Sequence, residues 1–202
     1  MKRILDSLIT KQISLGIIRE DERELYQYGY LIMCEWGFNI VMAALIALIT
    51  GAVQTTIIFL LSIIPLRSFA GGYHASTPGR CAVISNGCLV AVIWFSGIVF
   101  RYNLPVGYLF LSEILLTVVY FVHVPVDTPN KTLSSREKAV YGMIAKCLYL
   151  AELAIMAVLR TSNPKAAITM LSVHVCVVCS LVLASLTNGH TKSGKRENCP
   201  EL

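Results

Sequence analysis

The stretch RSFAGGYHASTPGRC, which begins at Arg67, holds a histidine and a cysteine seven residues apart, His74 and Cys81. A cysteine becomes a strong nucleophile when a neighbouring base takes its proton, and histidine can be that base. On one continuous helix the two residues would lie about 10 Å apart along the axis, too far to share a proton. Pro78 favours a turn near Thr77, which would let His74 fold back over the sulfur. The spacing therefore indicates a Cys–His pair for acyl transfer.

The same segment predicts that Cys81 lies in the first turn of a helix. Thr77 followed by Pro78 has the pattern of an N-cap with proline at the first helical position. The partial positive charge of a helix N-terminus, helped by Arg80 or Arg67, would favour thiolate over thiol. We therefore expect Cys81 to be the nucleophile of the pair.

Other residues are candidates to support this pair. Gly71 and Gly72 would let the loop fold tightly, and their amides are candidates to donate to an oxyanion. Arg67 would hold a substrate carboxylate or stabilise the oxyanion, and the alternative is an interfacial arginine with no catalytic part. Asp127, in another loop, is the position to test as the residue that orients His74, and the alternative is an ordinary turn residue.

The composition indicates which elements must position these residues. The chain is 55% hydrophobic and 14% charged, with a mean hydropathy of +0.66, which is typical of a multi-span membrane protein. Apolar runs of roughly 18 to 24 residues, enough to cross a hydrocarbon core about 30 Å thick, recur six times. The spans are expected at Tyr30–Thr50, Val53–Ala70, Cys81–Phe100, Leu104–Val124, Ala139–Leu159 and Ala166–Leu186.

The predicted fold class is therefore an all-α, polytopic membrane protein with six transmembrane helices. We expect a single domain over 1–202, in which 30–187 form the six-span bundle and 188–202 form a polar tail. The second span is the weakest, because Pro65 and Arg67 interrupt it. Its last turn is expected to lie at the interface or to be unwound.

The first 25 residues predict an amphipathic helix that lies in the membrane surface. Apolar side chains recur with a helical period at Ile4, Leu5, Leu8, Ile9 and Ile13. Such a helix would anchor the chain or pack on the bundle, or it would dock a peptide substrate brought to the same membrane face. No cleavable signal peptide is visible in this segment, so the first span is expected to act as an uncleaved signal.

The basic residues predict the orientation of the bundle. Thirteen lysines and arginines fall on the side of the N-terminus, three fall on the other side, and Lys146 lies within a span. Because positive charge concentrates in cytoplasmic loops, both termini and the 67–81 loop are expected at the cytoplasmic face. The basic excess is explained by this topology, and nucleic-acid binding is not expected.

Several polar residues lie inside the predicted spans. Glu113, Lys146 and Glu152 are functional candidates by position, and a structural contact between spans or between protomers is equally open. The segment HVCVVC, which begins at His174, lies in an apolar helix without a fourth ligand nearby, so neither a metal nor a cofactor is expected. Most of the seven cysteines are expected to be small buried hydrophobic residues rather than disulfide partners.

The run R-S-F-A-G-G-Y-H-A, with Cys81 seven residues after the histidine, resembles the signature of the accessory gene regulator B (AgrB) family of bacterial membrane peptidases. The likeness extends over nearly the whole chain and includes the amphipathic start, the six spans and the loop P-V-D-T-P-N-K at 125–131. It implies an endopeptidase that removes the C-terminal tail of a short amphipathic precursor peptide of the AgrD type. The enzyme would also help to cyclise the remainder into a quorum-sensing thiolactone or lactone.

The resemblance also implies roles for single residues. Cys81 would be the nucleophile, His74 its base, and Arg67 and Gly72 would both be needed. A bacterial cell membrane, an AgrD-type precursor, membrane lipid and a second copy in a homodimer are the implied surroundings and partners. The competing hypothesis is a membrane transporter of peptides or small solutes, in which the loop histidine and cysteine are incidental.

Overall fold

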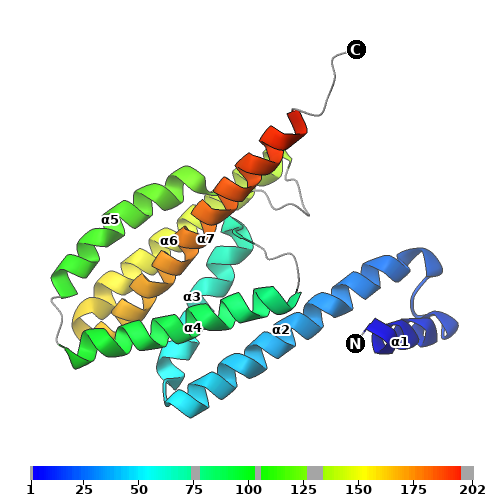
Figure 1. Ribbon diagram of the computed structural model, residues 1–202, viewed down its shortest axis with the longest axis horizontal. Coiled ribbons are helices and arrows are strands. Elements are labelled where there is room, and N and C mark those ends of the chain that lie inside the picture. Colours follow the sequence, from blue (N-terminus) through cyan, green and yellow to red (C-terminus); the bar gives the residue numbers. More distant parts are fainter. Residues whose placement is uncertain (1, 74–77, 103–105, 127–133, 197–202) are drawn as a thin grey trace. The chain divides into compact units, whose positions relative to one another are not determined.

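The computed structural model describes residues 2–73, 78–102, 106–126 and 134–196. Within these ranges the regular structure is helical throughout, and Figure 1 shows the course of the chain. The elements are α1 (Lys2–Ser14), η1 (Glu20–Glu22), α2 (Arg23–Thr50), α3 (Val53–Ala70), α4 (Pro78–Arg101), α5 (Val106–His123), α6 (Ser135–Ser162) and α7 (Pro164–Arg196). The predicted all-α class is confirmed.

Five helices among the described residues are long and apolar enough to cross a membrane. They are Glu20–Thr50, Val53–Ala70, Gly79–Arg101, Ser135–Ser162 and Pro164–Thr187. The apolar part of α5 that can be assessed, Phe110–His123, is shorter. The chain is thus a multi-pass membrane protein, and the count of six spans remains a prediction.

The chain divides into two compact units, Met1–Leu45 and Ile46–Leu202, and each is described by itself. In the first unit, α1 is tied to the beginning of α2 by side-chain hydrogen bonds, for example from Gln27 to Asp6 at 3.0 Å. Leu5 and Ile9, on the apolar face of α1, are buried. The helix α1 ends at Ser14 and is thus shorter than the predicted segment 1–25. Its place in the membrane surface remains a prediction.

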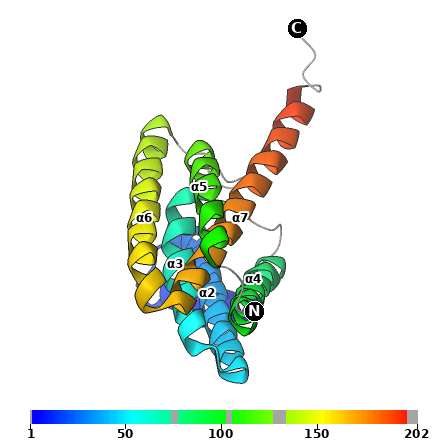
Figure 2. The same cartoon turned by 90° about the vertical axis from the view of Figure 1, so that its left-hand side faces the viewer.

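In the second unit, α7 is the central helix. It packs against α3, α4, α5 and α6, and Figure 2 shows it running between α6 on one side and α4 on the other. Of its candidate span 67% is buried, against 33% or less for each of the other four spans. The helix continues to Arg196, so the first part of the predicted polar tail is helical.

The helix α3 does not unwind at Pro65. Of the two sequence expectations for its last turn, unwinding is excluded, and a position at the membrane interface remains a prediction. The helix runs without a break from Val53 to Ala70 with Pro65 inside it. Proline removes one backbone hydrogen bond, whereas Leu66 and Ala70 in the following turn are fully buried and hold that turn in place. Arg67 therefore extends from the last turn of a regular helix.

The predicted start of α4 is confirmed, and a serine caps α6. The helix α4 begins at Pro78, and α6 follows Ser134, which is its N-cap. The Ser134 hydroxyl accepts a hydrogen bond from the Glu137 amide at 3.3 Å, and the Glu137 carboxylate accepts one from the Ser134 amide at 2.9 Å. This reciprocal pair is a capping box, which fixes the first turn of α6.

Candidate active site

The turn after α3 depends on Gly71. Its φ of +78° is a conformation that side chains other than glycine rarely adopt, and a Cβ built there would lie 2.4 Å from the Val126 carbonyl oxygen. The Gly71 amide donates to the Arg67 carbonyl at 3.1 Å, and the Val126 amide donates to the Ala70 carbonyl at 3.0 Å. The end of α3 is therefore fastened to the segment that follows α5.

The Gly71 amide is consequently not available to an oxyanion, contrary to one of the sequence expectations. It closes the last turn of α3 instead, which is the usual fate of an amide at a helix C-terminus. The second glycine of the pair, Gly72, is buried, and its part in oxyanion binding remains a prediction.

The backbone of Tyr73 is held on both sides. Its amide faces Ser180 of α7, with the hydroxyl oxygen at 3.1 Å and the carbonyl oxygen at 3.2 Å. Its carbonyl accepts a hydrogen bond from Nη2 of Arg67 at 2.7 Å. We call Arg67, Tyr73 and Ser180 the Tyr73 clamp. Tyr73 directly precedes His74 in the sequence, so the clamp fixes the position of the residue before the predicted base.

Gly72 lies inside the clamp. A Cβ at this position would approach the Ser180 hydroxyl oxygen to 2.8 Å and the Arg67 Nε to 3.6 Å, and its φ is +142°. A side chain here would enter the space between the two residues that hold Tyr73. The clamp thus gives a physical reason for glycine at position 72 and a structural role for Arg67. The Arg67 guanidinium has further N–H donors, which the bond to Tyr73 does not use.

Cys81 lies in the first turn of α4, as predicted, and it is half-buried with a free thiol. Cys88 follows two turns later on the same face of the helix.

His74 and Asp127 lie outside the described residues, so their roles remain predictions. The residues that directly precede them are described, and both belong to the same region. Val126 is bonded to the end of α3, and Tyr73 is held three residues beyond that end. The main-chain approaches to the two predicted residues are therefore fastened to the same end of α3.

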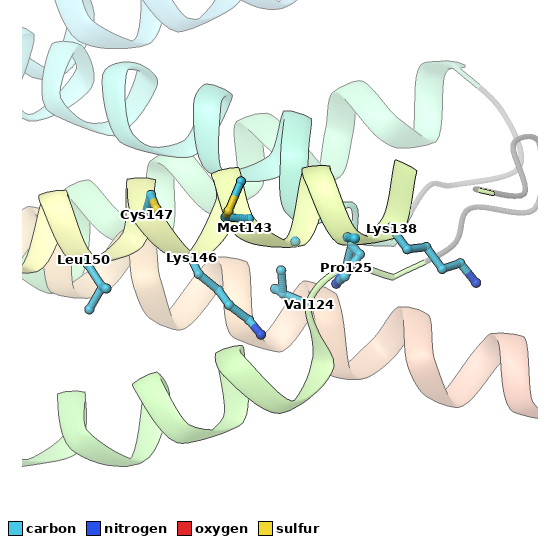
Figure 3. A pocket seen from close by; sticks show the side chains of 9 residues that line it. Val124, Pro125, Lys138, Met143, Lys146, Cys147 and Leu150 are labelled. Carbon is cyan, nitrogen blue, oxygen red and sulfur yellow. The ribbon is translucent and has the colours of Figure 1, made fainter. Parts of the chain in front are cut away.

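A groove of about 350 Å³ lies along α6 beside the end of α5. Figure 3 shows Lys138 and Lys146 extending from α6 with Val124 and Pro125 between them. The residues that line the groove include Cys147 but neither Cys81 nor Arg67. The groove is thus separate from the predicted nucleophile, and Cys147 becomes a second thiol for experiments to test.

The remaining candidates give no metal site. In the part of the chain that the structure describes, no group of His, Cys, Asp and Glu side chains is arranged to hold a metal ion. His174 instead contacts Glu113 and Glu152 across three helices. A contact between spans was one of the two readings left open for these glutamates by the sequence, and it is the one observed.

Ser180 is the site residue that sequence reasoning missed. It lies in the apolar run of α7, 107 residues from Tyr73, and nothing in its local sequence marks it. Single serines are common in membrane helices, where their hydroxyls usually bond to the preceding turn. Only the packing of α7 against the end of α3 identifies it.

Comparison with known proteins places the chain among relatives. A family model described as Accessory gene regulator B matches residues 1–187. The chain belongs to the AgrB family. This membership confirms the likeness that the Arg67–Cys81 segment and the pattern of apolar spans indicated.

Two AgrB-like proteins of Clostridium perfringens are among its relatives. The AgrB-like protein of strain SM101 (type A) is 26% identical over 144 residues, and AgrB-like protein 2 of strain 13 (type A) is 25% identical over 144 residues. In both cases the match covers 66% of this chain and 65% of the relative, so the chain spans just under two thirds of their length. No solved structure matches the chain significantly.

Proposed function

We propose that this AgrB family member is a membrane cysteine endopeptidase that matures a quorum-sensing propeptide of the AgrD type. Cys81 is the nucleophile and His74 is the base. The enzyme removes the C-terminal tail of the precursor and promotes cyclisation of the remainder to a thiolactone or lactone autoinducing peptide. The family match over residues 1–187, which includes the whole Arg67–Cys81 segment, supports this function.

The observation that carries the proposal is the position of Cys81 in the first turn of α4. The N-terminal turn of a helix favours a thiolate, because its free amides and the helix dipole stabilise negative charge. The Tyr73 clamp supports the other half of the pair, since it holds the residue before His74 against α7. The helix that carries Cys81 and the loop that carries His74 therefore both begin next to residues with defined positions.

The chemistry follows from these groups. His74 takes the thiol proton of Cys81, and the thiolate adds to the carbonyl carbon at the cleavage point. The C–N bond breaks, the tail leaves as an amine with the proton from His74, and the precursor stays on Cys81 as a thioester. A thiol of the bound peptide then gives its proton to His74 and attacks the thioester, which closes the ring and releases the Cys81 thiolate beside the protonated His74. One thioester is exchanged for another, so cyclisation requires no ATP.

The setting of the reaction follows from the charge distribution. We place both termini and the catalytic loop at the cytoplasmic face of the bacterial membrane, because thirteen basic residues fall on that side and three on the other. The precursor would reach the site along the membrane surface, in contact with lipid. A homodimer is part of the proposal, and Asp127 is proposed as the residue that orients His74.

The proposal is tested by co-expressing the full chain with a panel of tagged AgrD-type precursors. The wild type, Cys81→Ala and Cys147→Ala are compared for precursor cleavage on gels and for an acyl adduct by mass spectrometry. Cys147→Ala is the matched control, because Cys147 is an exposed thiol in a groove that also carries two lysines. We expect cleavage and a hydroxylamine-sensitive adduct on Cys81 with wild type and Cys147→Ala, and neither with Cys81→Ala.

Two other outcomes contradict the proposal in different ways. If Cys147→Ala abolishes cleavage and Cys81→Ala does not, the enzyme is a peptidase with a different nucleophile. If the wild type cleaves no precursor of the panel, the peptidase function is contradicted. A membrane transporter with an incidental histidine and cysteine then becomes the better hypothesis.

A further inference from the structure

A buried polar network joins α5, α6 and α7. Nδ1 of His174 lies 2.6 Å from Oε1 of Glu113, and Nε2 of His174 lies 3.2 Å from Oε2 of Glu152. The hydroxyl of Tyr149 donates to the same Oε1 of Glu113 at 2.6 Å. The Tyr149 ring stacks on His174 and on Tyr120, with centroids 4.3 and 4.2 Å apart. We call Glu113, Glu152 and His174 the intramembrane triad.

The triad lies deep inside the bundle. His174 has no exposed surface, and Glu113 and Glu152 are 6% and 8% exposed. Each residue lies seven to ten positions from the nearer end of its helix, which at 1.5 Å per residue is roughly 10 to 15 Å. The helices α6 and α7 are candidate membrane spans, so this depth corresponds to the hydrocarbon core. Uncompensated charge is strongly unfavourable there.

The two contacts of His174 fix a minimum number of protons. A neutral imidazole has one N–H donor and one acceptor nitrogen. If both glutamates were ionised, the acceptor nitrogen would face a carboxylate oxygen, and that contact would be repulsive. One additional proton turns the imidazole into an imidazolium that donates to both carboxyl groups. With that single proton the triad still has a net charge of −1.

Glu113 has a second oxygen that points to a further proton. Its Oε2 is buried and has no hydrogen-bond partner among the described groups, while its Oε1 accepts from both Tyr149 and His174. A buried carboxylate oxygen without a donor is unfavourable by several kcal/mol as an order of magnitude. A proton on Oε2 replaces the buried charge by a neutral hydroxyl, which is less unfavourable to bury, and leaves Oε1 as a carbonyl oxygen that still accepts two bonds.

Among the residues that the structure describes, Glu113 and Glu152 form ion pairs with His174 and with no other cation. The Lys146 ammonium of α6 lies over the Phe121 ring, 5.5 Å from its centroid, and forms no ion pair with the triad. The only ionisable residue of α3 is Arg67, which belongs to the Tyr73 clamp. The other titratable residues of the helices that pack against α7 include Tyr120, Tyr141, Tyr149, Cys81, Cys88, Cys147, Arg80, Arg101, Arg136, Lys138, Arg160 and, on α7 itself, Lys165, Cys176 and Cys179.

We propose that the intramembrane triad is a proton-binding site that holds two protons while α5, α6 and α7 are packed together. One proton completes the imidazolium of His174, which pairs with the Glu152 carboxylate. The other resides on Oε2 of Glu113, and the triad has no net charge. This site uses none of the proposed catalytic residues, so the proposal can be tested independently of the peptidase function.

Difference infrared spectroscopy on the purified full chain in lipid nanodiscs tests the position of the second proton. A protonated carboxyl group has a C=O stretching band that a carboxylate lacks, and the band shifts in D2O. We expect such a band at neutral pH in the wild type, and we expect Glu113→Gln to remove it. Glu113→Gln should fold, because the glutamine carbonyl can accept the same two hydrogen bonds that Oε1 accepts. The absence of the band from the wild type, or its persistence in Glu113→Gln, overturns the assignment.

A pH series of unfolding in mixed micelles tests the number of protons. Above about pH 7 an unfolded chain exposes these side chains, and exposed histidine and glutamate hold almost no proton there. The packed state would hold two, so stability must fall as pH rises. We expect the unfolding equilibrium constant of wild type to rise tenfold more per pH unit than that of Glu113→Gln. Equal slopes in the two proteins would show that Glu113 holds no proton and would overturn the proposal.

Discussion

The Tyr73 clamp and the intramembrane triad both use α7, but they use different chemical groups. In the clamp, Arg67 and Ser180 hold the main-chain amide and carbonyl of a single residue. In the triad, three ionisable side chains from three helices satisfy one another with little exposure to solvent. The clamp positions a loop at the end of α3, whereas the triad joins helices in the interior of the bundle.

This difference predicts different consequences of mutation. A lost clamp contact leaves a backbone group near the end of a helix, where another donor or water can replace part of the bond. A lost triad member leaves a charged group in the hydrocarbon core without a partner. Changes in the triad should therefore reduce the stability of the bundle, and changes in the clamp should mainly reduce the rate of peptide processing.

His174→Ala should have the largest effect on stability. It removes the imidazole that both buried glutamates contact and leaves Glu113 with the Tyr149 hydroxyl. Breaking a buried charge pair destabilises a protein by about 3–5 kcal/mol. Unfolding in mixed micelles measures the loss, with the exposed neighbour Val175→Ala as the matched control. Equal stability of the two variants would mean that the triad does not hold α5, α6 and α7 together.

Gly71→Ala should come next and should act on processing. The added Cβ would lie 2.4 Å from the Val126 carbonyl oxygen in a backbone conformation that alanine rarely adopts. Strain of this kind amounts to about 1–3 kcal/mol, so we expect a cleavage rate that is lower by about fivefold to a hundredfold. The control is Gly97→Ala, because a Cβ at Gly97 meets no atom within 4 Å. A wild-type cleavage rate for Gly71→Ala would show that the turn at Gly71 does not position the catalytic loop.

Arg67→Gln tests what the guanidinium does. A hydrogen bond from a charged group contributes about 1.5–3 kcal/mol, and this variant loses the bond to the Tyr73 carbonyl. If Arg67 positions the loop, kcat falls by roughly tenfold or more and KM changes little. A rise in KM at constant kcat would instead indicate that Arg67 binds the substrate carboxylate. Arg136→Gln, at an exposed position in the first turn of α6, is the control.

Ser180→Ala should have the smallest effect of the four. The Tyr73 amide loses the hydroxyl at 3.1 Å but keeps the Ser180 carbonyl at 3.2 Å. A single neutral hydrogen bond contributes about 0.5–1.5 kcal/mol, so we expect a few-fold lower cleavage rate and unchanged unfolding. Ser68→Ala removes only a bond within α3 and should process at the wild-type rate. An effect of Ser180→Ala as large as that of Arg67→Gln would show that the hydroxyl dominates the clamp.

The sequence predicted the local features of this protein well. The bounds Val53–Ala70 of α3 and the start of α4 at Pro78 both follow from residues within a few positions of the boundary. Proline, glycine and short polar side chains act on their own backbone, so their effect can be read without knowing the fold. The unbroken helix through Pro65 departs from this rule, because buried contacts of the next turn decide it.

The site was predicted only in part. The motif predicted Arg67, Gly71, Gly72 and Cys81 as site residues. In the structure Arg67 and Gly72 lie in the Tyr73 clamp, and Gly71 forms the turn beside Val126. The Gly71 amide, a candidate oxyanion donor by sequence, is bonded to the Arg67 carbonyl at the end of α3. Ser180 could not have been predicted, since a single serine in an apolar run gives no signal of its own.

The sequence by itself determined that this is a helical membrane protein, where along the chain its apolar helices lie, and which family it belongs to. Those properties depend on apolar length and on neighbouring residues, and both are present in a linear sequence. Only the tertiary structure decided that Tyr73 meets Ser180, 107 residues away, and that Glu113 meets His174, 61 residues away. Such meetings depend on the register and rotation with which helices pack, and many apolar faces would satisfy the same hydrophobic pattern.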